Sequence, residues 1–299
     1  SDGAWGTALA MVACGRGHEV MLWGPFADYI EEMRETRRNE RFLKGIELPE
    51  TLKLTADMEE AVSGAGIIIM AAPTQFARSG LEIMAGIGLG PDQILVSVAK
   101  GIECGTLKRL SEMCAEILGE DVNYCVLSGP SHAEEVAREV PTAVVVAATD
   151  PARTATVQEA LVSDYFRVYT SDDVVGVELG AALKNVFAIA AGICDGMGLG
   201  DNSKAALLTR GIAEMARVGC ALGGRTETFA GLSGIGDMIV TCTSGHSRNR
   251  FVGEELGKGQ ALDTIIEGMG MVVAEGVKTT ESAYELVGGL GIETPVIDE

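Results

Sequence analysis

The lysine at position 184 lies in a stretch of sequence that carries almost no other charge. Residues 178–187 read ELGAALKNVF, and apolar residues recur at a helical spacing over 174–194. A lysine on such a helix extends its ammonium group to solvent or faces a polar cleft, because burial of an unpaired charge is costly. In a cleft, partial burial and a second cation such as Lys100 would favour a neutral amine, which can act as a general base. Lys184 alone favours the simpler explanation, extension to solvent, so other residues must decide between the two.

Arg248 is a second candidate, because it follows a serine that can begin a helix. Ser247 has the residue type of an N-cap, which places Arg248 and Asn249 in the first helical turn. An arginine there is unfavourable for the helix itself, since the helix dipole favours acidic residues at that end. Free backbone amides, the dipole and a guanidinium would instead converge on a phosphate or another oxyanion. We therefore interpret residues 247–249 as an anion site.

Three other polar residues follow predicted strands or turns. Lys100 comes after a predicted strand and is followed by glycine, so solvation and ligand binding are equally good explanations for it. Ser131 and Glu134 have the S-x-x-E spacing of a capping box, which predicts that Ser131 is an N-cap at the ligand edge of the sheet, while His132 is expected at the surface or in packing. Asp237 is either a turn residue or a group that orients the base.

A glycine-rich turn opens the sequence. Residues 1–6 read SDGAWG and precede a helical run, and a strand is predicted at 19–23. The turn resembles the latter part of a G-x-G-x-x-G motif, whose glycines let the backbone approach a pyrophosphate at a helix N-terminus. The spacing alone is common, but the alternation of strands and helices after it favours dinucleotide binding. Trp23, Gly24 and Pro25 stand where an acidic residue would select NAD, and no nearby arginine would select NADP, so both cofactors remain open.

The elements that must position these residues alternate in the first part of the sequence. Strands are predicted at 19–23, 66–72, 93–99, 124–128, 142–148 and 166–169, and helices at 28–38, 75–87, 107–118, 131–139 and 151–163. Apolar strands separated by helices pair in parallel, which predicts a doubly wound, mostly parallel, Rossmann-like α/β sheet. Further helices are predicted at 174–194, 202–222 with Asn202 as N-cap, 247–256, 261–267 and 279–287. We expect residues 1–172 to form the sheet domain and residues 173–299 an all-helical domain.

The composition excludes several classes of function. The net charge of −20 over 299 residues argues against nucleic acid and anionic membranes as partners. Seven cysteines without a C-x-x-C pair are typical of reduced thiols in a cytoplasm and indicate neither a disulfide framework nor a metal site. No apolar run reaches the roughly 18 residues of a membrane span, so we expect no stable membrane insertion. The alanine-rich helical half favours a homodimer. The opening turn without a preceding strand, and the stop at Glu299 just after a turn at Pro295, predict a sequence clipped at both ends.

Six motifs, in order, resemble the bacterial type of the NAD(P)-dependent glycerol-3-phosphate dehydrogenases: residues 3–10, 98–101, 127–131, 183–186, 234–237 and 247–250. The resemblance implies interconversion of sn-glycerol 3-phosphate and dihydroxyacetone phosphate for phospholipid synthesis, with NAD or NADP as cofactor and Lys184 as proton acceptor. The substrate contacts that it implies are Lys100, Gly129, Ser131, Lys184, Asp237, Ser247, Arg248 and Asn249. The cofactor contacts that it implies are Gly3, Ala4, Trp5, Gly6, Lys100, Ala133, Arg248, Val273 and Glu275.

The sequence departs from the family pattern at positions 1 and 25, and two other functions stay open. Ser1 stands where the family has its first glycine, and Pro25 stands where a basic or polar cofactor contact is usual. The first alternative is a related β-hydroxyacid or ketopantoate-type reductase, whose carboxylate substrates would leave a phosphate site at 247–249 misplaced. The second is a sensor that binds a dinucleotide without turnover, against which Lys184 and Asp237 both argue.

Overall fold

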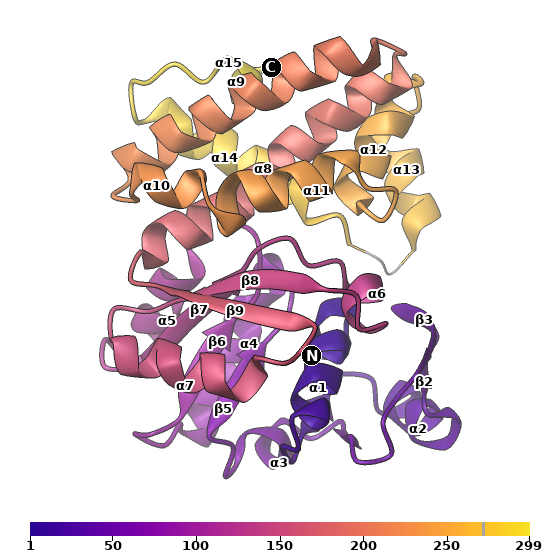
Figure 1. The fold of residues 1–299 in the computed structure, drawn as a ribbon, viewed down its shortest axis with the longest axis vertical. Helices are drawn as coiled ribbons and strands as arrows, with labels where there is room; N and C mark the ends of the chain where they lie inside the picture. The colour runs from indigo at the N-terminus through magenta and orange to yellow at the C-terminus, as the bar shows by residue number, and fades with distance from the viewer. Residues whose placement is uncertain (271–272) are drawn as a thin grey trace.

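The computed structural model describes residues 1–270 and 273–299. Figure 1 shows the first half of the chain, in indigo to magenta, as strands flanked by helices, and the second half, in orange and yellow, as a group of helices packed above it. This arrangement is the α/β sheet followed by an all-helical part that the sequence predicts.

The main sheet has five strands in the order β5-β6-β7-β8-β9. Strand β8 runs antiparallel to β7, and the other neighbours are parallel. Two small pairs lie apart from it: β1 with β4 in parallel and β2 with β3 in antiparallel orientation. The strands are β1 (Met21–Trp23), β2 (Arg38–Asn39), β3 (Leu43–Glu47), β4 (Lys53–Thr55), β5 (Ile67–Met70), β6 (Ile94–Ser97), β7 (Asn123–Ser128), β8 (Thr142–Ala147) and β9 (Phe166–Ser171). Strands β2, β3 and β4 were not predicted, because they are short and only partly apolar.

Helices cover both faces of the main sheet. Alternate residues of one strand reach opposite cores: Val96 of β6 joins the core that includes α1 and α7, and its neighbour Leu95 joins the core that includes α4 and α5. This alternation is what a doubly wound sheet requires. The helices of this part are α1 (Ala4–Gly15), α2 (Ala27–Thr36), α3 (Met58–Val62), α4 (Thr74–Ile87), α5 (Leu110–Leu118), α6 (Ala133–Val136) and α7 (Pro151–Leu161).

Helix α8 is the central element of the second half. The elements there are α8 (Val174–Gly196), α9 (Gly200–Ala221), α10 (Thr226–Phe229), the π-helical turn η1 (Leu232–Gly236), α11 (Asp237–Thr243), α12 (Arg248–Gly257), α13 (Leu262–Met269), α14 (Glu275–Gly288) and α15 (Pro295–Asp298). By length and composition α8 could cross a membrane, which corrects the expectation that no segment reaches that length. However, 78% of its most apolar window is buried inside the protein, so this hydropathy is that of a core helix.

Two predicted helix starts are wrong. Ser131 is not an N-cap, because α6 begins after His132, and no capping box forms there. Asn202 lies inside α9, whose N-cap position is held by Leu199. The first prediction relied on the S-x-x-E spacing and the second on residue type, whereas the hydroxyl of Ser131 is engaged elsewhere, as described below. The helix predicted at 279–287 also begins earlier, at Glu275.

Glycines bring α12 into direct backbone contact with α8. A Cβ atom on Gly192 would clash with the carbonyl oxygen of Arg250, and one on Gly253 would clash with the carbonyl oxygen of Ile189. Gly196 meets the backbone of α12 in the same way, one turn further along α8. Side chains would separate the two helices, so the glycines fix the position of the start of α12 relative to the middle of α8.

We expect Gly253→Ala to lower the free energy of unfolding by about 1–3 kcal/mol, because the new methyl group must push two helix backbones apart. Urea denaturation followed by circular dichroism measures this. Gly80→Ala is the matched control: Gly80 also lies inside a helix, but a Cβ there meets nothing within 4 Å. The control should be neutral or stabilising by up to about 1 kcal/mol. Equal effects of both changes would contradict the packing argument.

Candidate active site

The carboxylate of Asp237 lies between two lysines. Lys184 Nζ donates to Asp237 Oδ1 at 2.8 Å, and Lys100 Nζ donates to Asp237 Oδ2 at 2.7 Å. All three side chains are nearly buried, with exposed side-chain fractions of 7% for Lys184, 14% for Lys100 and 2% for Asp237. Lys184 comes from the middle of α8, Asp237 begins α11, and Lys100 follows β6 of the sheet. Lys184 therefore faces a polar site and does not extend to solvent.

Lys100 is held by two further groups from the loop after β7. Its Nζ also donates to the carbonyl oxygen of Gly129 at 3.0 Å and to Ser131 Oγ at 3.2 Å. Ser131 Oγ donates to the same carbonyl oxygen at 2.8 Å, which explains why it caps no helix. Gly129 has a φ of 138°, and a Cβ there would lie 3.0 Å from Val144 Cα. Only glycine fits this loop, whose carbonyl oxygen faces the ammonium group.

Lys184 has a second partner that sequence reasoning missed. Its Nζ donates to Thr241 Oγ1 at 2.7 Å, and Thr241 Oγ1 donates to the backbone carbonyl oxygen of Asp237 at 2.6 Å. Asp237 and Thr241 are four residues apart on α11 and therefore lie on one face of that helix. This D-x-x-x-T spacing is the signal in the sequence that could have identified Thr241.

The buried charges of this cluster do not balance, because two ammonium groups face one carboxylate. The pKa of Lys100 is lowered to about 8, mainly by burial and also by the charge of Lys184, against the opposing effects of Asp237 and, more weakly, Glu275. Burial alone would raise the pKa of Asp237, but the two lysines outweigh it and hold this pKa below its usual value. The cluster is therefore suited to an anion or to negative charge that develops on a bound oxygen.

A chain of amides ties this cluster to α12 and α14. Asn185 Nδ2 donates to the carbonyl oxygen of Lys100 at 2.7 Å, and Asn249 Nδ2 donates to Asn185 Oδ1 at 2.8 Å. The backbone N–H of Gly276 donates to Asn249 Oδ1 at 2.9 Å. Asn185 was not predicted as a site residue, although it adjoins Lys184. Asn249 reaches the cluster through Asn185.

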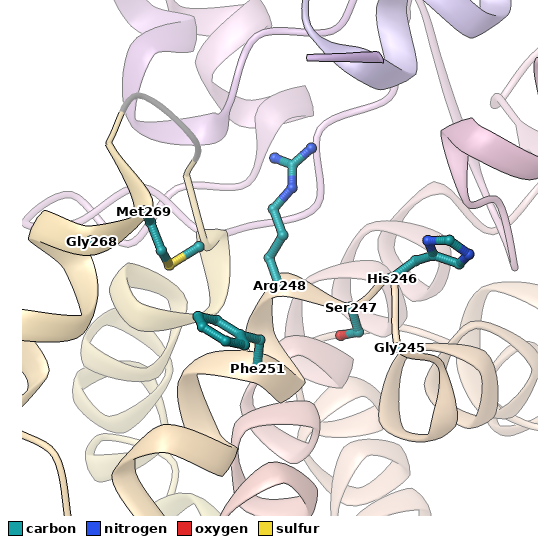
Figure 2. Close-up of a pocket in the computed structure, with 7 residues that line it drawn as sticks. All are labelled: Gly245, His246, Ser247, Arg248, Phe251, Gly268 and Met269. Carbon is teal, nitrogen blue, oxygen red and sulfur yellow. The ribbon is translucent and has the colours of Figure 1, made fainter. Parts of the chain in front are cut away.

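The start of α12 has the predicted geometry. Ser247 is its N-cap, and Ser247 Oγ accepts a hydrogen bond from the backbone N–H of Arg250 at 3.2 Å. Arg248 is exposed and extends from the helix toward the first half of the chain (Figure 2). Its Nη1 donates to the carbonyl oxygen of Val273, just before α14, at 3.2 Å. These residues line an open pocket of about 370 Å³: Gly245, His246, Ser247, Arg248, Phe251, Gly268 and Met269.

The glycine-rich turn lies at the carboxyl end of β5. A Cβ on Gly6 would clash with the carbonyl oxygen of Ser1 and lie 3.0 Å from Cβ of Ala71, which follows β5. A Cβ on Gly3 would meet nothing within 4 Å, so the backbone is open there, and no side chain caps the first N–H groups of α1. Uncapped amides beside an open glycine at this edge of a parallel sheet fit the pyrophosphate of a dinucleotide.

Asp2 is a feature of this turn to which sequence reasoning gave no role. It is buried, and its Oδ2 has no hydrogen-bond partner among the described residues. Burial raises the pKa of Asp2. A raised pKa favours the neutral acid, which opposes a bound phosphate less than a carboxylate would.

The remaining predicted cofactor residues lie around these groups. Ala133 begins α6, and Trp5 lies in the first turn of α1 with its ring 6.3 Å from that of Phe166. Glu275 begins α14 and accepts hydrogen bonds from Thr74. None of the hydrogen bonds found in residues 1–270 and 273–299 connects Arg248 or the glycine-rich turn directly to Asp237.

Comparisons with known proteins agree with this geometry along the whole chain. Residues 2–154 match the model of the NAD-dependent glycerol-3-phosphate dehydrogenase N-terminus, and residues 173–299 match that of the C-terminus. A glycerol-3-phosphate dehydrogenase (NAD(P)+) of Geobacillus kaustophilus is 51% identical over 298 residues, which cover 99% of this chain and 86% of that protein. The chain belongs to the NAD-dependent glycerol-3-phosphate dehydrogenase family.

A solved structure of this dehydrogenase family superposes on the chain more closely than that of an alternative reductase. The crystal structure of glycerol-3-phosphate dehydrogenase from Coxiella burnetii superposes with a TM-score of 0.94 at 38% identity, covering 99% of this chain and 90% of that one. A ketopantoate reductase from Ralstonia eutropha reaches a TM-score of 0.57 at 14% identity, covering 96% of each chain. The second likeness concerns the fold alone.

We expect Asp237→Asn to lower the free energy of unfolding by about 3–5 kcal/mol, because it leaves two buried ammonium groups without a counter-charge. Chemical denaturation at neutral pH measures this loss. Asp172→Asn is the control: Asp172 also pairs with a cation, here Arg225, but both side chains are exposed. That change should have little effect on stability. A stability loss no larger for Asp237→Asn than for the control would refute the importance of the buried pairs.

Proposed function

We propose that this chain interconverts sn-glycerol 3-phosphate and dihydroxyacetone phosphate with NAD or NADP, and that Lys184 accepts and returns the proton. The observation that carries the proposal is the buried cluster of Lys184, Asp237 and Lys100, which holds one positive charge in excess. The family supports an NAD(P)-linked oxidoreductase. The geometry supports a division of roles between the two lysines.

The number of hydrogen bonds at each lysine distinguishes these roles. An ammonium group has three N–H donors. Those of Lys100 are all engaged, by Gly129, Ser131 and Asp237. Lys184 has two partners among the described residues, Asp237 and Thr241, which leaves one position on its nitrogen for a substrate hydroxyl. Lys184 is therefore the lysine that can exchange a proton with the substrate, while Lys100 supplies a fixed positive charge.

The proposed chemistry follows from these positions. A bound nicotinamide would accept hydride from C2 of glycerol 3-phosphate, or donate hydride to the carbonyl carbon in reverse. Lys184, as the free amine, takes the proton of the C2 hydroxyl group, and its ammonium form returns that proton. Asp237 and Thr241 hold the amine in place, and Lys100 stabilises negative charge on the oxygen, a contribution worth several kcal/mol in comparable sites.

Substrate and cofactor would be held by the other predicted residues. The N-terminus of α12 with Ser247, Arg248 and Asn249 is suited to the phosphate group, whose binding energy would position C2. Gly129 and Ser131 would contact substrate beside Lys100. The turn of Gly3, Ala4, Trp5 and Gly6 would hold the pyrophosphate, with Ala133, Arg248, Val273, Glu275 and Lys100 as further cofactor contacts.

We also propose a cytoplasmic homodimer that supplies glycerol 3-phosphate to phospholipid synthesis.

Lys184→Ala should lower kcat by about 100- to 10,000-fold, because no other group in the cluster has a free position for the proton. NADH oxidation with dihydroxyacetone phosphate measures this, and circular dichroism checks the fold. Lys278→Ala, at an exposed lysine paired with Glu281, is the control and should keep its turnover. Near-wild-type turnover of Lys184→Ala would remove Lys184 from the mechanism.

The alternative reductase is tested in the same assay, with α-keto acids in place of dihydroxyacetone phosphate.

Lys100→Arg should move the alkaline limb of kcat/KM to higher pH. With its pKa lowered to about 8, Lys100 loses its charge as the pH rises through that value, so kcat/KM for dihydroxyacetone phosphate should fall. Arginine stays charged, so the fall should come later even if its maximum is lower. Profiles over about pH 6–10 at saturating NADH measure this. An alkaline limb at the same pH in both proteins would show that another group controls it; Lys108→Arg is the control.

A further inference from the structure

Thr74 and Glu275 join the two halves of the chain at the cofactor side of the site. Thr74 is the first residue of α4, and Glu275 is the first residue of α14. The backbone N–H of Thr74 donates to Glu275 Oε1 at 2.7 Å, and Thr74 Oγ1 donates to the same oxygen at 2.8 Å. Thr74 is buried and Glu275 is half-buried. The contact thus links positions that are 201 residues apart in the sequence.

Two helix N-termini meet at this one carboxylate. Helix α4 has Pro73 at its N-cap position, which provides no side-chain cap, so its first N–H group takes its partner from α14. Glu275 also lies in the first turn of its own helix, where the helix dipole favours an acidic residue. Both α4 and α14 therefore stabilise the negative charge, and the hydroxyl of Thr74 fixes which oxygen faces α4.

The second oxygen of Glu275 is available to a ligand. Within the described parts of the chain, Oε2 takes part in no hydrogen bond, and the residue is only half-buried. The carboxylate lies close to the loop of Lys100, because Thr74, which donates to it, packs against the next residue, Gly101. The position of the Thr74 hydroxyl is also closely defined, because a Cβ on Gly101, the residue after Lys100, would lie 2.6 Å from Thr74 Oγ1.

We propose that Thr74 is a positioning residue: it holds Oε1 of Glu275 so that Oε2 accepts a hydrogen bond from a hydroxyl or carboxamide N–H of the dinucleotide. A carboxylate only accepts hydrogen bonds, so its partner on the cofactor must be such a donor. The contact would also hold α4 and α14 together around the bound cofactor. This inference rests on the proposed function, in which Glu275 contacts the cofactor.

The test begins with three single variants of the full chain, at Thr74 and Thr279. Thr74→Val removes the hydroxyl and keeps the backbone N–H and the side-chain shape, and Thr74→Ser restores a hydroxyl. We expect Thr74→Val to raise the Kd of NADH about tenfold, since a hydrogen bond to a charged group is lost, while kcat at saturating NADH changes much less. Thr279→Val is the matched control, because that buried hydroxyl donates to the backbone carbonyl oxygen of Glu275 and not to its carboxylate.

Four outcomes are informative. Weak NADH binding by Thr74→Val alone, with recovery in Thr74→Ser, supports the positioning role. Equal weakening by Thr74→Val and Thr279→Val, or no recovery with serine, would reduce Thr74 to a packing residue and overturn the inference. On a Glu275→Ala background, Thr74→Val should add no further loss of NADH affinity, and full additivity would refute coupling through the carboxylate. Unchanged NADH affinity of Glu275→Ala would also overturn it.

A failure of the proposed function is recognised separately. If the wild-type protein binds NADH but does not reduce dihydroxyacetone phosphate, the proposed reaction is wrong, yet the NADH affinities of the same variants still decide whether Thr74 acts through Glu275. If the wild type turns over normally and the Thr74 variants bind NADH as it does, only the positioning role is wrong.

Discussion

The site depends on one carboxylate that holds two ammonium groups inside the protein. Without Asp237, Lys100 and Lys184 would repel each other in a place where neither can be hydrated, and one of them would have to lose its proton or leave. With Asp237 the cluster is stable but keeps one positive charge in excess, although the chain as a whole carries a net charge of −20. A locally positive site in an acidic protein gives an anionic substrate a single well-defined place to bind.

Helix α8 makes this arrangement possible because it contacts both halves of the chain. At its N-terminal end, Glu178 accepts hydrogen bonds from Tyr124 of β7 at 2.6 Å and from Arg109 before α5 at 2.7 Å, which attach the helix to the sheet. In its middle it carries Lys184 and Asn185. At its C-terminal end, glycines bring α12 close and so fix where that helix begins. The spacing between Lys184, the proposed proton acceptor, and the start of α12, the proposed anion site, is therefore set by backbone packing.

The sequence contained enough to predict the fold class and the N-cap at Ser247 with Arg248 after it, because periodicity and capping are local properties. Lys184 alone favoured extension to solvent, and only the other motifs favoured a polar cleft. The sequence did not predict the hydrogen bonds between residues that lie far apart along the chain. Ser131 was assigned to a capping box, yet its hydroxyl lies between Gly129 and Lys100. Thr241 was missed although it follows Asp237 at a helical spacing, and Thr74 carries no signal in the sequence until folding places Glu275 beside it. Likewise, only the helices packed around α8 show that its hydropathy is that of a core helix and not of a membrane span.

The hydrogen bonds of Lys100 show how substrate can enter a site whose cation is already fully bonded. Its three N–H groups donate to protein acceptors. A substrate oxygen can therefore accept a hydrogen bond from Lys100 only if one of these protein acceptors is released. Ser131 Oγ is the one to release, because at 3.2 Å it is the longest of the three and a serine hydroxyl can rotate. The carbonyl oxygen of Gly129 belongs to a loop packed closely against Val144, and Asp237 carries the charge, so both must stay. A rotation of one hydroxyl would thus exchange a protein partner of Lys100 for the substrate while the charges of the cluster stay in place.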